Sequence, residues 1–334
     1  AFYLDQPPEV TDHNQLLVLS FDGSGVVMRP EGLRAATRKR AEMDSRRRST
    51  AETAATMGQR PVRKHRRRMA EVATVYDLDV VPRSPDDIVR GLDGSGAASA
   101  RPKAKNKRVW ASIERSVQDV VDEAFIEASM RHPALQRRWV AVVGGNKDQL
   151  NCIRGMAGNI GVHLTVVVDF IHVLGYLWNA GKALEGGDKD ATEEWVTTRA
   201  RRLLAGDTSS VAAAMRRSAT SRGLTGKPRD AVDDCARYLL NNKQYLRYHE
   251  FLRDGLPIAS GVIEGACRSL VKDRMDITGA RWGLPGAEAI LKLRSLRASG
   301  DLDRYLAFHF NRERQRNHLG KFHQDELLAL RRAA

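Results

Sequence analysis

The sequence is poor in cysteine and has no long apolar run, and each shortage excludes a class of protein. Its three cysteines, Cys152, Cys235 and Cys267, are far apart and show none of the paired spacing of a zinc site. An odd number of cysteines is typical of a reducing compartment, so we expect buried free thiols. No apolar stretch approaches the roughly 20 residues that a membrane helix needs, and no signal peptide opens the chain. We therefore expect a cytoplasmic protein.

Acidic residues are also in deficit, because 55 lysines and arginines face 41 aspartates and glutamates, a net charge of +14. A field of this sign attracts phosphate backbones and is typical of nucleic-acid binders, although a basic protein without such a partner is the simpler alternative. The densest basic stretch covers residues 34–70 and contains Arg46, Arg47, Arg48, Arg66, Arg67 and Arg68. We expect a solvated helix or arm that a polyanion neutralises, with an exposed loop as the alternative.

Several short apolar runs end at an acid or a glycine, which is typical of buried strands. The run from Leu17 stops at Asp22, and Gly23 and Gly25 predict a tight turn before a second strand at 26–28. Further strands are predicted at 72–81, at 139–143 before Gly144, and at 164–168 before Asp169. In an open α/β sheet the chemistry lies at such strand ends.

The rest of the pattern predicts helices, because apolar residues recur at spacings of three and four. The predicted ranges are 109–130, 170–184, 191–251 with a break near 223–228, 261–275 and much of 286–334. We expect an α/β fold with a mixed sheet of about five strands. Residues 1–175 and 256–300 would form one core, with the basic arm at 34–70, a helical insertion at 176–255 and a basic helical tail at 301–334.

Three carboxylates on separate predicted elements, Asp22, Asp169 and Glu264, suggest an oxygen-ligand site for Mg²⁺ rather than for zinc. Two such ions about 4 Å apart activate water or a 3′ hydroxyl in phosphodiester chemistry. By themselves these residues are a weak signal, because an acid at a strand end or on a helix is common. Glu264, for instance, is also spaced to pair with Arg268 on one helix face.

Four segments resemble bacterial DDE transposases of the ISKra insertion-sequence type, a family similar to Mutator-like transposases. They are LVLSFDGSGVVMRPEGLR, RWVAVVGGNKDQL, VVVDFIHVLGYLW and SGVIEGACRSLVKDRMDITGARWGLPGAEAILKLRSLRASGD. The resemblance runs from Leu17 to about His318. It implies a ribonuclease-H-like catalytic domain with a helical insertion before the last acid. It makes Asp22 the first catalytic acid and Glu264 the third, both metal ligands.

The second acid is missing, because family members resemble VALVDGNxxQL where this chain has Gly144 in VAVVGGNKDQL. Asp148 and Asp169 are the candidate replacements. In the expected strand order 3-2-1-4-5, however, the fifth strand lies roughly 10 Å from the first. The family's Asp-x-x-His element, matched by Asp169 and His172, is a supporting feature of the site. The structural alternative is an acid that caps a helix beside a core histidine.

The resemblance also implies partners and a location. The partners are insertion-sequence ends and target DNA, bound by a homodimer or higher oligomer in the bacterial nucleoid, with two Mg²⁺ or Mn²⁺ ions. Arg268, Lys272, Arg274 and Arg281 are the predicted phosphate contacts after Glu264. The chain opens on Ala1 in a polar lead-in, so we expect an upstream segment that reads the terminal repeats. Two other functions stay open: a DNA-binding protein that has lost catalysis at Gly144, and an RNA-binding helical protein.

Overall fold

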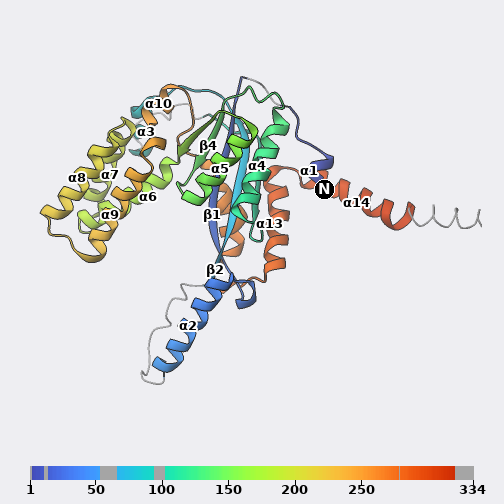
Figure 1. Cartoon of the computed structure of the whole chain (residues 1–334), viewed down its shortest axis with the longest axis horizontal. Helices are drawn as coiled ribbons and strands as arrows, with labels where there is room; N and C mark the ends of the chain where they lie inside the picture. The colour runs from blue at the N-terminus through green and yellow to red at the C-terminus, as the bar shows by residue number, and fades with distance from the viewer. Residues whose placement is uncertain (1, 11–13, 53–65, 94–101, 278, 320–334) are drawn as a thin grey trace, which may run out of the picture.

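The computed structural model describes residues 2–10, 14–52, 66–93, 102–277 and 279–319. Its centre is a five-stranded sheet with the strand order β3-β2-β1-β4-β5 (Figure 1). The strands are β1 (Leu16–Val27), β2 (Arg67–Leu78), β3 (Lys105–Ser112), β4 (Trp139–Val143) and β5 (Leu164–Val168). β2 is antiparallel to both β1 and β3, while β4 and β5 run parallel to β1. The expected mixed sheet flanked by helices is confirmed, as are the predicted bounds of β4 and β5.

The predicted hairpin at Gly23 and Gly25 is wrong, because β1 continues straight through both glycines. Gly23 pairs with Glu71 and Gly25 with Met69 on β2. A Cβ at Gly23 would lie 2.9 Å from the terminal methyl of Met69. The glycines therefore make room for β2 side chains that lie over the strand, rather than turning the chain. The returning strand is β2.

The predicted helix over 109–130 begins too early, because residues 105–112 form β3. α4 (Val117–Arg131) starts only after Ser116, which caps it together with Asp119 in a capping box. Val109, Ala111 and Ile113 alternate and are buried in one apolar cluster, while Trp110 between them is buried in the other, as in a strand packed on both faces. Their spacing also continues into the apolar stripe of α4, which explains the misplaced boundary.

Helices cover both faces of the sheet (Figure 1). α4 packs on β1 and β2, with α5 (Lys147–Ile160) beside it. The other face carries α11 (Gly261–Ala266), the π-helical segment η3 (Cys267–Lys272), α12 (Asp273–Met275) and α13 (Leu284–Ser299). There Ile263, Leu270 and Val271 join Val26 and Val72 in one apolar cluster. The cluster fixes the helix of Glu264 against the strand of Asp22.

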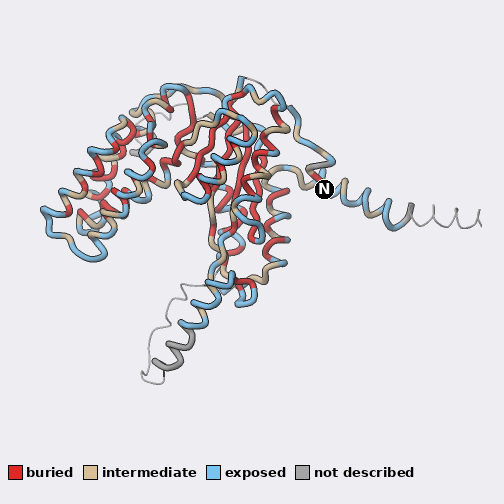
Figure 2. Tube along the Cα trace, in the orientation of Figure 1, coloured by how far each residue is buried: buried red, intermediate tan, exposed pale blue. Residues whose placement is uncertain are grey.

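A helical layer extends to one side of the sheet. It contains α6 (Phe170–Leu184), α7 (Lys189–Leu204), α8 (Thr208–Ser221), α9 (Gly226–Asn241), the short 3-10 turn η2 (Lys243–Tyr245) and α10 (Tyr248–Arg253). α3 (Pro85–Asp93), from an earlier part of the chain, packs on α7. The predicted α6 bounds are confirmed, and the 191–251 stretch is several helices with a second break at Gly206. The layer shares one hydrophobic core with the sheet (Figure 2).

Two helices project away from this core. α2 (Ala35–Glu52) extends from the end of the sheet toward which β1 runs, and α14 (Leu302–Arg314) projects on the side opposite the helical layer of α6 to α10 (Figures 1 and 2). The remaining short helical pieces are α1 (Phe2–Asp5), η1 (Pro30–Gly32) and η4 (Gln315–Leu319). The predicted arm is thus helical over α2, its residues 53–65 lie outside the described part, and Arg67 and Arg68 belong to β2. Within the described residues, no helix is long and apolar enough to cross a membrane.

Candidate metal centre

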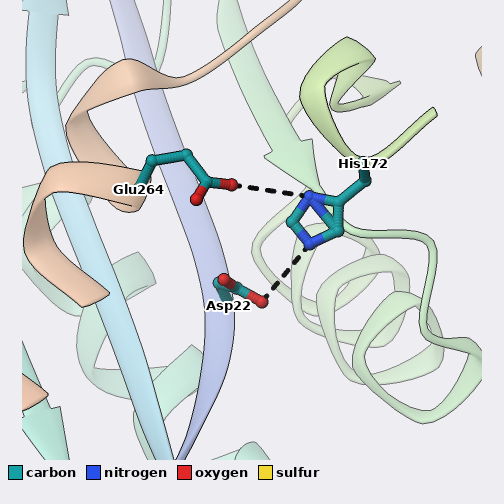
Figure 3. Close-up of side chains that lie close together, drawn as sticks. All are labelled: Asp22, His172 and Glu264. Atoms are coloured by element: carbon teal, nitrogen blue, oxygen red, sulfur yellow. Dashed lines mark ion pairs between the residues drawn. The ribbon is translucent and has the colours of Figure 1, made fainter. Parts of the chain in front are cut away.

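Three side chains from different parts of the chain converge at one point beside the sheet (Figure 3). Asp22 comes from β1, His172 from α6 and Glu264 from α11. One potential ligand atom from each lies within 4.8 Å of the others. The imidazole stands between the two acids, with Nε2 3.5 Å from Asp22 Oδ1 and Nδ1 3.6 Å from Glu264 Oε1. The structure therefore brings together two predicted acids and the predicted supporting histidine.

The strand register explains why Asp22 is accessible. Phe21 is the last β1 residue paired with β4, opposite Val143, so Asp22 comes just after the position at which β4 stops. Beyond it, β1 continues with β2 alone. Asp22 pairs with Val72, whose side chain lies in the cluster beneath α11. Because paired residues of antiparallel strands project to the same face, Asp22 faces the helix of Glu264.

Asp169 orients the site without joining the cluster. It caps α6, and its Oδ1 accepts a hydrogen bond from the Ile171 amide at 2.8 Å. Its Oδ2 accepts one from the Ser260 amide at 2.9 Å, and the Ser260 side chain caps α11. One buried carboxylate thus fixes the first turns of the two helices that carry His172 and Glu264. Burial raises the pKa of Asp169, while the two backbone hydrogen bonds oppose that shift.

Gly144 follows β4 directly and lies against the imidazole of His172. A Cβ at this position would be 2.9 Å from both Cδ2 and Nε2 of the ring, so any larger residue would displace it. The Gly144 carbonyl accepts a hydrogen bond from Tyr238 of α9 at 3.0 Å, which ties the strand end to the helical layer. The position that lacks an acid is therefore filled in space by His172.

Cys267 is a site residue that the sequence analysis described only as a buried thiol. Its Sγ donates to Asp22 Oδ2 at 3.4 Å, while the Gly23 amide donates to Oδ1 at 2.8 Å. Burial and the neighbouring Asp22 raise the pKa of the thiol, which keeps it protonated as a donor. The spacing of three residues from Glu264 on a helix is the sequence signal for this contact. Cys267 also opens the π-helical segment η3, a distortion frequent at functional sites.

The acids at the centre crowd one another. Burial, followed by the charges of Asp22 and Asp169, raises the pKa of Glu264. Burial also raises the pKa of Glu71 on β2, and Asp22 adds to that shift. Among the described residues, the ion pairs of Asp22 and Glu264 are with His172 alone. Such crowding is typical of a site that is completed by a cation.

The three residues fit a divalent ion. His172 Nδ1 is buried and has no hydrogen-bond partner. The two ring nitrogens lie 3.5 and 3.6 Å from the carboxylate oxygens that they face, farther than in charge-assisted hydrogen bonds of about 2.7–2.9 Å. One ring nitrogen and one oxygen from each acid lie within 4.8 Å of one another, so a single ion would take one nitrogen and two oxygens. Asp148, the other candidate acid, is exposed in the first turn of α5 and is not part of the cluster.

The predicted DNA contacts lie in three places: after Glu264, within α2 and at the start of β2. Arg268, Lys272, Arg274 and Arg281 are all exposed on the segment that follows Glu264. Arg46, Arg47 and Arg48 lie within α2. Arg68 is different, because its guanidinium donates to the carbonyls of Ile113 and Gly32, and Arg67 pairs with Asp276. Arg66 lies just before β2, and its carbonyl accepts a hydrogen bond from the Met28 amide at 2.9 Å.

Comparisons of the chain with protein-family models, with curated proteins and with solved structures found no match.

Proposed function

We propose that the chain is the catalytic region of a DDE-type DNA transposase of the ISKra type, built on a ribonuclease-H-like core. Its reaction would be metal-dependent DNA cleavage and strand transfer at insertion-sequence ends. The observation that carries this proposal is the convergence of Asp22, His172 and Glu264 beside the ends of β4 and β5. The strand order and directions agree with what the resemblance implies for the fold.

Asp22 and Glu264 would hold the metal, Mg²⁺ or Mn²⁺, with two ions expected for this chemistry. When bound, such ions activate water or a 3′ hydroxyl and stabilise the departing oxygen of a phosphodiester. The protein's own groups prepare the site. The Gly23 amide and the Cys267 thiol hold Asp22, and Asp169 fixes the helix starts that aim His172 and Glu264.

The exposed basic residues after Glu264 would contact DNA phosphates beside the centre. α2 would add backbone affinity, because it extends from the end of the sheet toward which β1 runs beyond Asp22 (Figure 1). Contacts of this kind carry no sequence information and weaken steeply with salt. Association into a homodimer at paired DNA ends forms part of the same proposal.

A second candidate is a DNA-binding protein derived from such a transposase that no longer cleaves. Gly144 favours it, because this position has no side chain to supply the second acid. In this case the basic surface would act without chemistry at Asp22.

Cleavage assays separate the two candidates. We expect the protein to nick supercoiled plasmid, and to join linear duplexes with free 3′ hydroxyls to it, in Mg²⁺ or Mn²⁺. Asp22→Ala and Glu264→Ala should each lower the rate by about 1000-fold, since metal stabilisation of the transition state is worth several kcal/mol. The matched control is Asp148→Ala, which removes an exposed acid in the first turn of α5 and should leave cleavage normal.

Two results would contradict the catalytic proposal. If the wild-type protein binds duplex DNA but cleaves with neither ion, the second candidate stands. If cleavage survives Asp22→Ala unchanged, the activity does not come from this centre. RNA and duplex DNA should compete unequally for binding, in favour of DNA.

A further inference from the structure

We infer that His172 is a metal ligand in the place of the acid missing at Gly144, and that the centre therefore prefers a transition-metal ion such as Mn²⁺ over Mg²⁺. This inference rests on the proposed function, because it assigns the ligands and the ion of the same centre. It concerns binding and can be tested without any catalytic measurement.

Gly144 and His172 are complementary in space. The ring passes so close to the end of β4 that a Cβ at position 144 would be 2.9 Å from two of its atoms. An acid at Gly144 and the imidazole in its observed place exclude one another. The missing side chain is therefore the condition for the histidine to stand between Asp22 and Glu264.

The helix that carries the His172 ring is held in place. Asp169 caps α6 through the Ile171 amide, one residue before His172. Val173 and Leu177 are fully buried in the hydrophobic core and fix the face of α6. His172 itself keeps 26% of its side chain exposed, so solvent ions reach it. A ligand aimed by packing and by a second carboxylate is typical of metal centres.

The distances around His172 do not fit a histidine that only forms ion pairs with the two acids. A protonated imidazole that simply neutralised the two acids would donate hydrogen bonds of about 2.7–2.9 Å to them. The observed separations are 3.5 and 3.6 Å, and Nδ1 is buried with no hydrogen-bond partner. Neither distance is that of a charge-assisted hydrogen bond, and one ring nitrogen lies within 4.8 Å of one oxygen from each acid, so a single ion would take that nitrogen and the two oxygens.

The donor set decides the class of ion. Mg²⁺ prefers oxygen ligands, whereas imidazole nitrogen favours transition metals, whose affinities rise along the series from Mn²⁺. Asp22 and Glu264 supply oxygen and His172 supplies nitrogen. This mixed set retains Mn²⁺, which accepts both kinds of ligand, and lowers the relative affinity for Mg²⁺.

Mn²⁺ binding followed by pulsed electron paramagnetic resonance tests this assignment. We expect the wild-type protein to bind Mn²⁺ with the nitrogen modulation of a directly ligated imidazole. His172→Ala should remove that modulation and weaken binding at least about tenfold, as loss of a ligand or its support does. His163→Ala, which removes an exposed histidine, is the matched control and should leave both unchanged.

A relocated ligand provides the second arm. Gly144→Asp combined with His172→Ala restores an oxygen ligand in the freed space. Compared with His172→Ala alone, we expect tighter Mn²⁺ binding without nitrogen modulation, and Mg²⁺ should compete better with Mn²⁺ than it does in the wild-type protein. Calorimetric titration of each ion gives these affinities.

The outcomes separate this inference from the function on which it rests. If Mn²⁺ binds and Asp22→Ala abolishes binding, but the wild-type spectrum lacks nitrogen modulation, His172 is not a ligand and only this inference fails. The same holds if His172→Ala binds Mn²⁺ as tightly as wild type does. If the wild-type protein binds neither Mn²⁺ nor Mg²⁺, the metal centre itself is wrong and both proposals fail.

Discussion

The start and the middle of β1 lie beside acids in opposite environments. Near the start, Asp77 of the neighbouring β2 pairs with Arg137 at 2.8 Å, and both side chains are fully buried. In the middle, where β4 stops, Asp22 and Glu264 face a single imidazole at 3.5 and 3.6 Å. Both regions place carboxylates beside the same strand. The difference shows which acids are neutralised by arginine for the fold and which face only an imidazole.

The structural acids are neutralised and fully hydrogen-bonded. Arg137 also donates to the carbonyls of Gln15 and Leu16, which fastens β4 to the start of β1. On α4, Glu127 is likewise held between Arg108 and Arg131. At the centre, burial and like charge instead raise the pKa of Glu264. Functional sites commonly store destabilisation of this kind, which a ligand relieves.

The largest loss of stability is expected when the fully buried ion pair between Arg137 and Asp77 is broken. Arg137→Met leaves Asp77 as an uncompensated buried charge and should lower the free energy of unfolding by about 3–5 kcal/mol. Denaturant titration followed by circular dichroism measures this loss. Arg138→Met, on the exposed neighbouring residue, should change stability by less than about 0.5 kcal/mol. Equal losses of stability from the two changes would contradict the view that the Asp77–Arg137 pair is a structural ion pair.

An intermediate effect is expected at Glu288, a buried acid held by neutral donors. Its carboxylate accepts hydrogen bonds from Ser112 Oγ and from the Ile113 amide, which joins α13 to the end of β3. Glu288→Ala leaves that amide unsatisfied and should cost about 1–3 kcal/mol of unfolding free energy in the same titration. Lys292→Ala removes only its exposed ion-pair partner and should cost less than about 1 kcal/mol. A larger loss at Lys292 than at Glu288 would contradict this account.

The smallest change in stability is expected at the metal centre, where a substitution should raise the stability instead of lowering it. Because burial and the neighbouring acids raise the pKa of Glu264 above its ordinary value of 4.5, the folded protein binds the proton more tightly than the unfolded chain does. This contribution to stability is present below that value and is lost as the pH rises through the folded pKa. Glu264→Gln should therefore raise the melting temperature at pH 7, without metal, by at most about 3 °C.

Two measurements check the sign. The gain from Glu264→Gln in thermal unfolding should shrink as the pH falls toward and below 4.5, where the wild-type acid is protonated even in the unfolded chain. With Mn²⁺ present the order should reverse, because binding stabilises only the protein with an intact centre. A loss of stability at pH 7 in chelator would place Glu264 with the structural acids instead.

The local sequence was sufficient to predict a strand where one short apolar run forms the whole strand. Trp139–Val143 and Leu164–Val168 are short apolar runs in the middle and at one edge of the sheet, and their predicted bounds match β4 and β5. The local sequence was insufficient where contacts with other helices and strands decide the secondary structure. Gly23 and Gly25 permit a turn, but pairing with β2 keeps them extended. Val109 to Ile113 fits either period, and packing under α13 makes it a strand.

The same division applies to the site. The sequence by itself determined the excess of basic charge, the buried strand that carries Asp22 and the absence of an acid at Gly144. Only the tertiary structure decided that the imidazole of His172 occupies the space beside Gly144, that Cys267 supports Asp22, and that both oxygens of Asp169 are engaged by backbone amides. The physical reason is that a missing side chain can be seen in the sequence, whereas the group that fills its space comes from a helix placed there by packing.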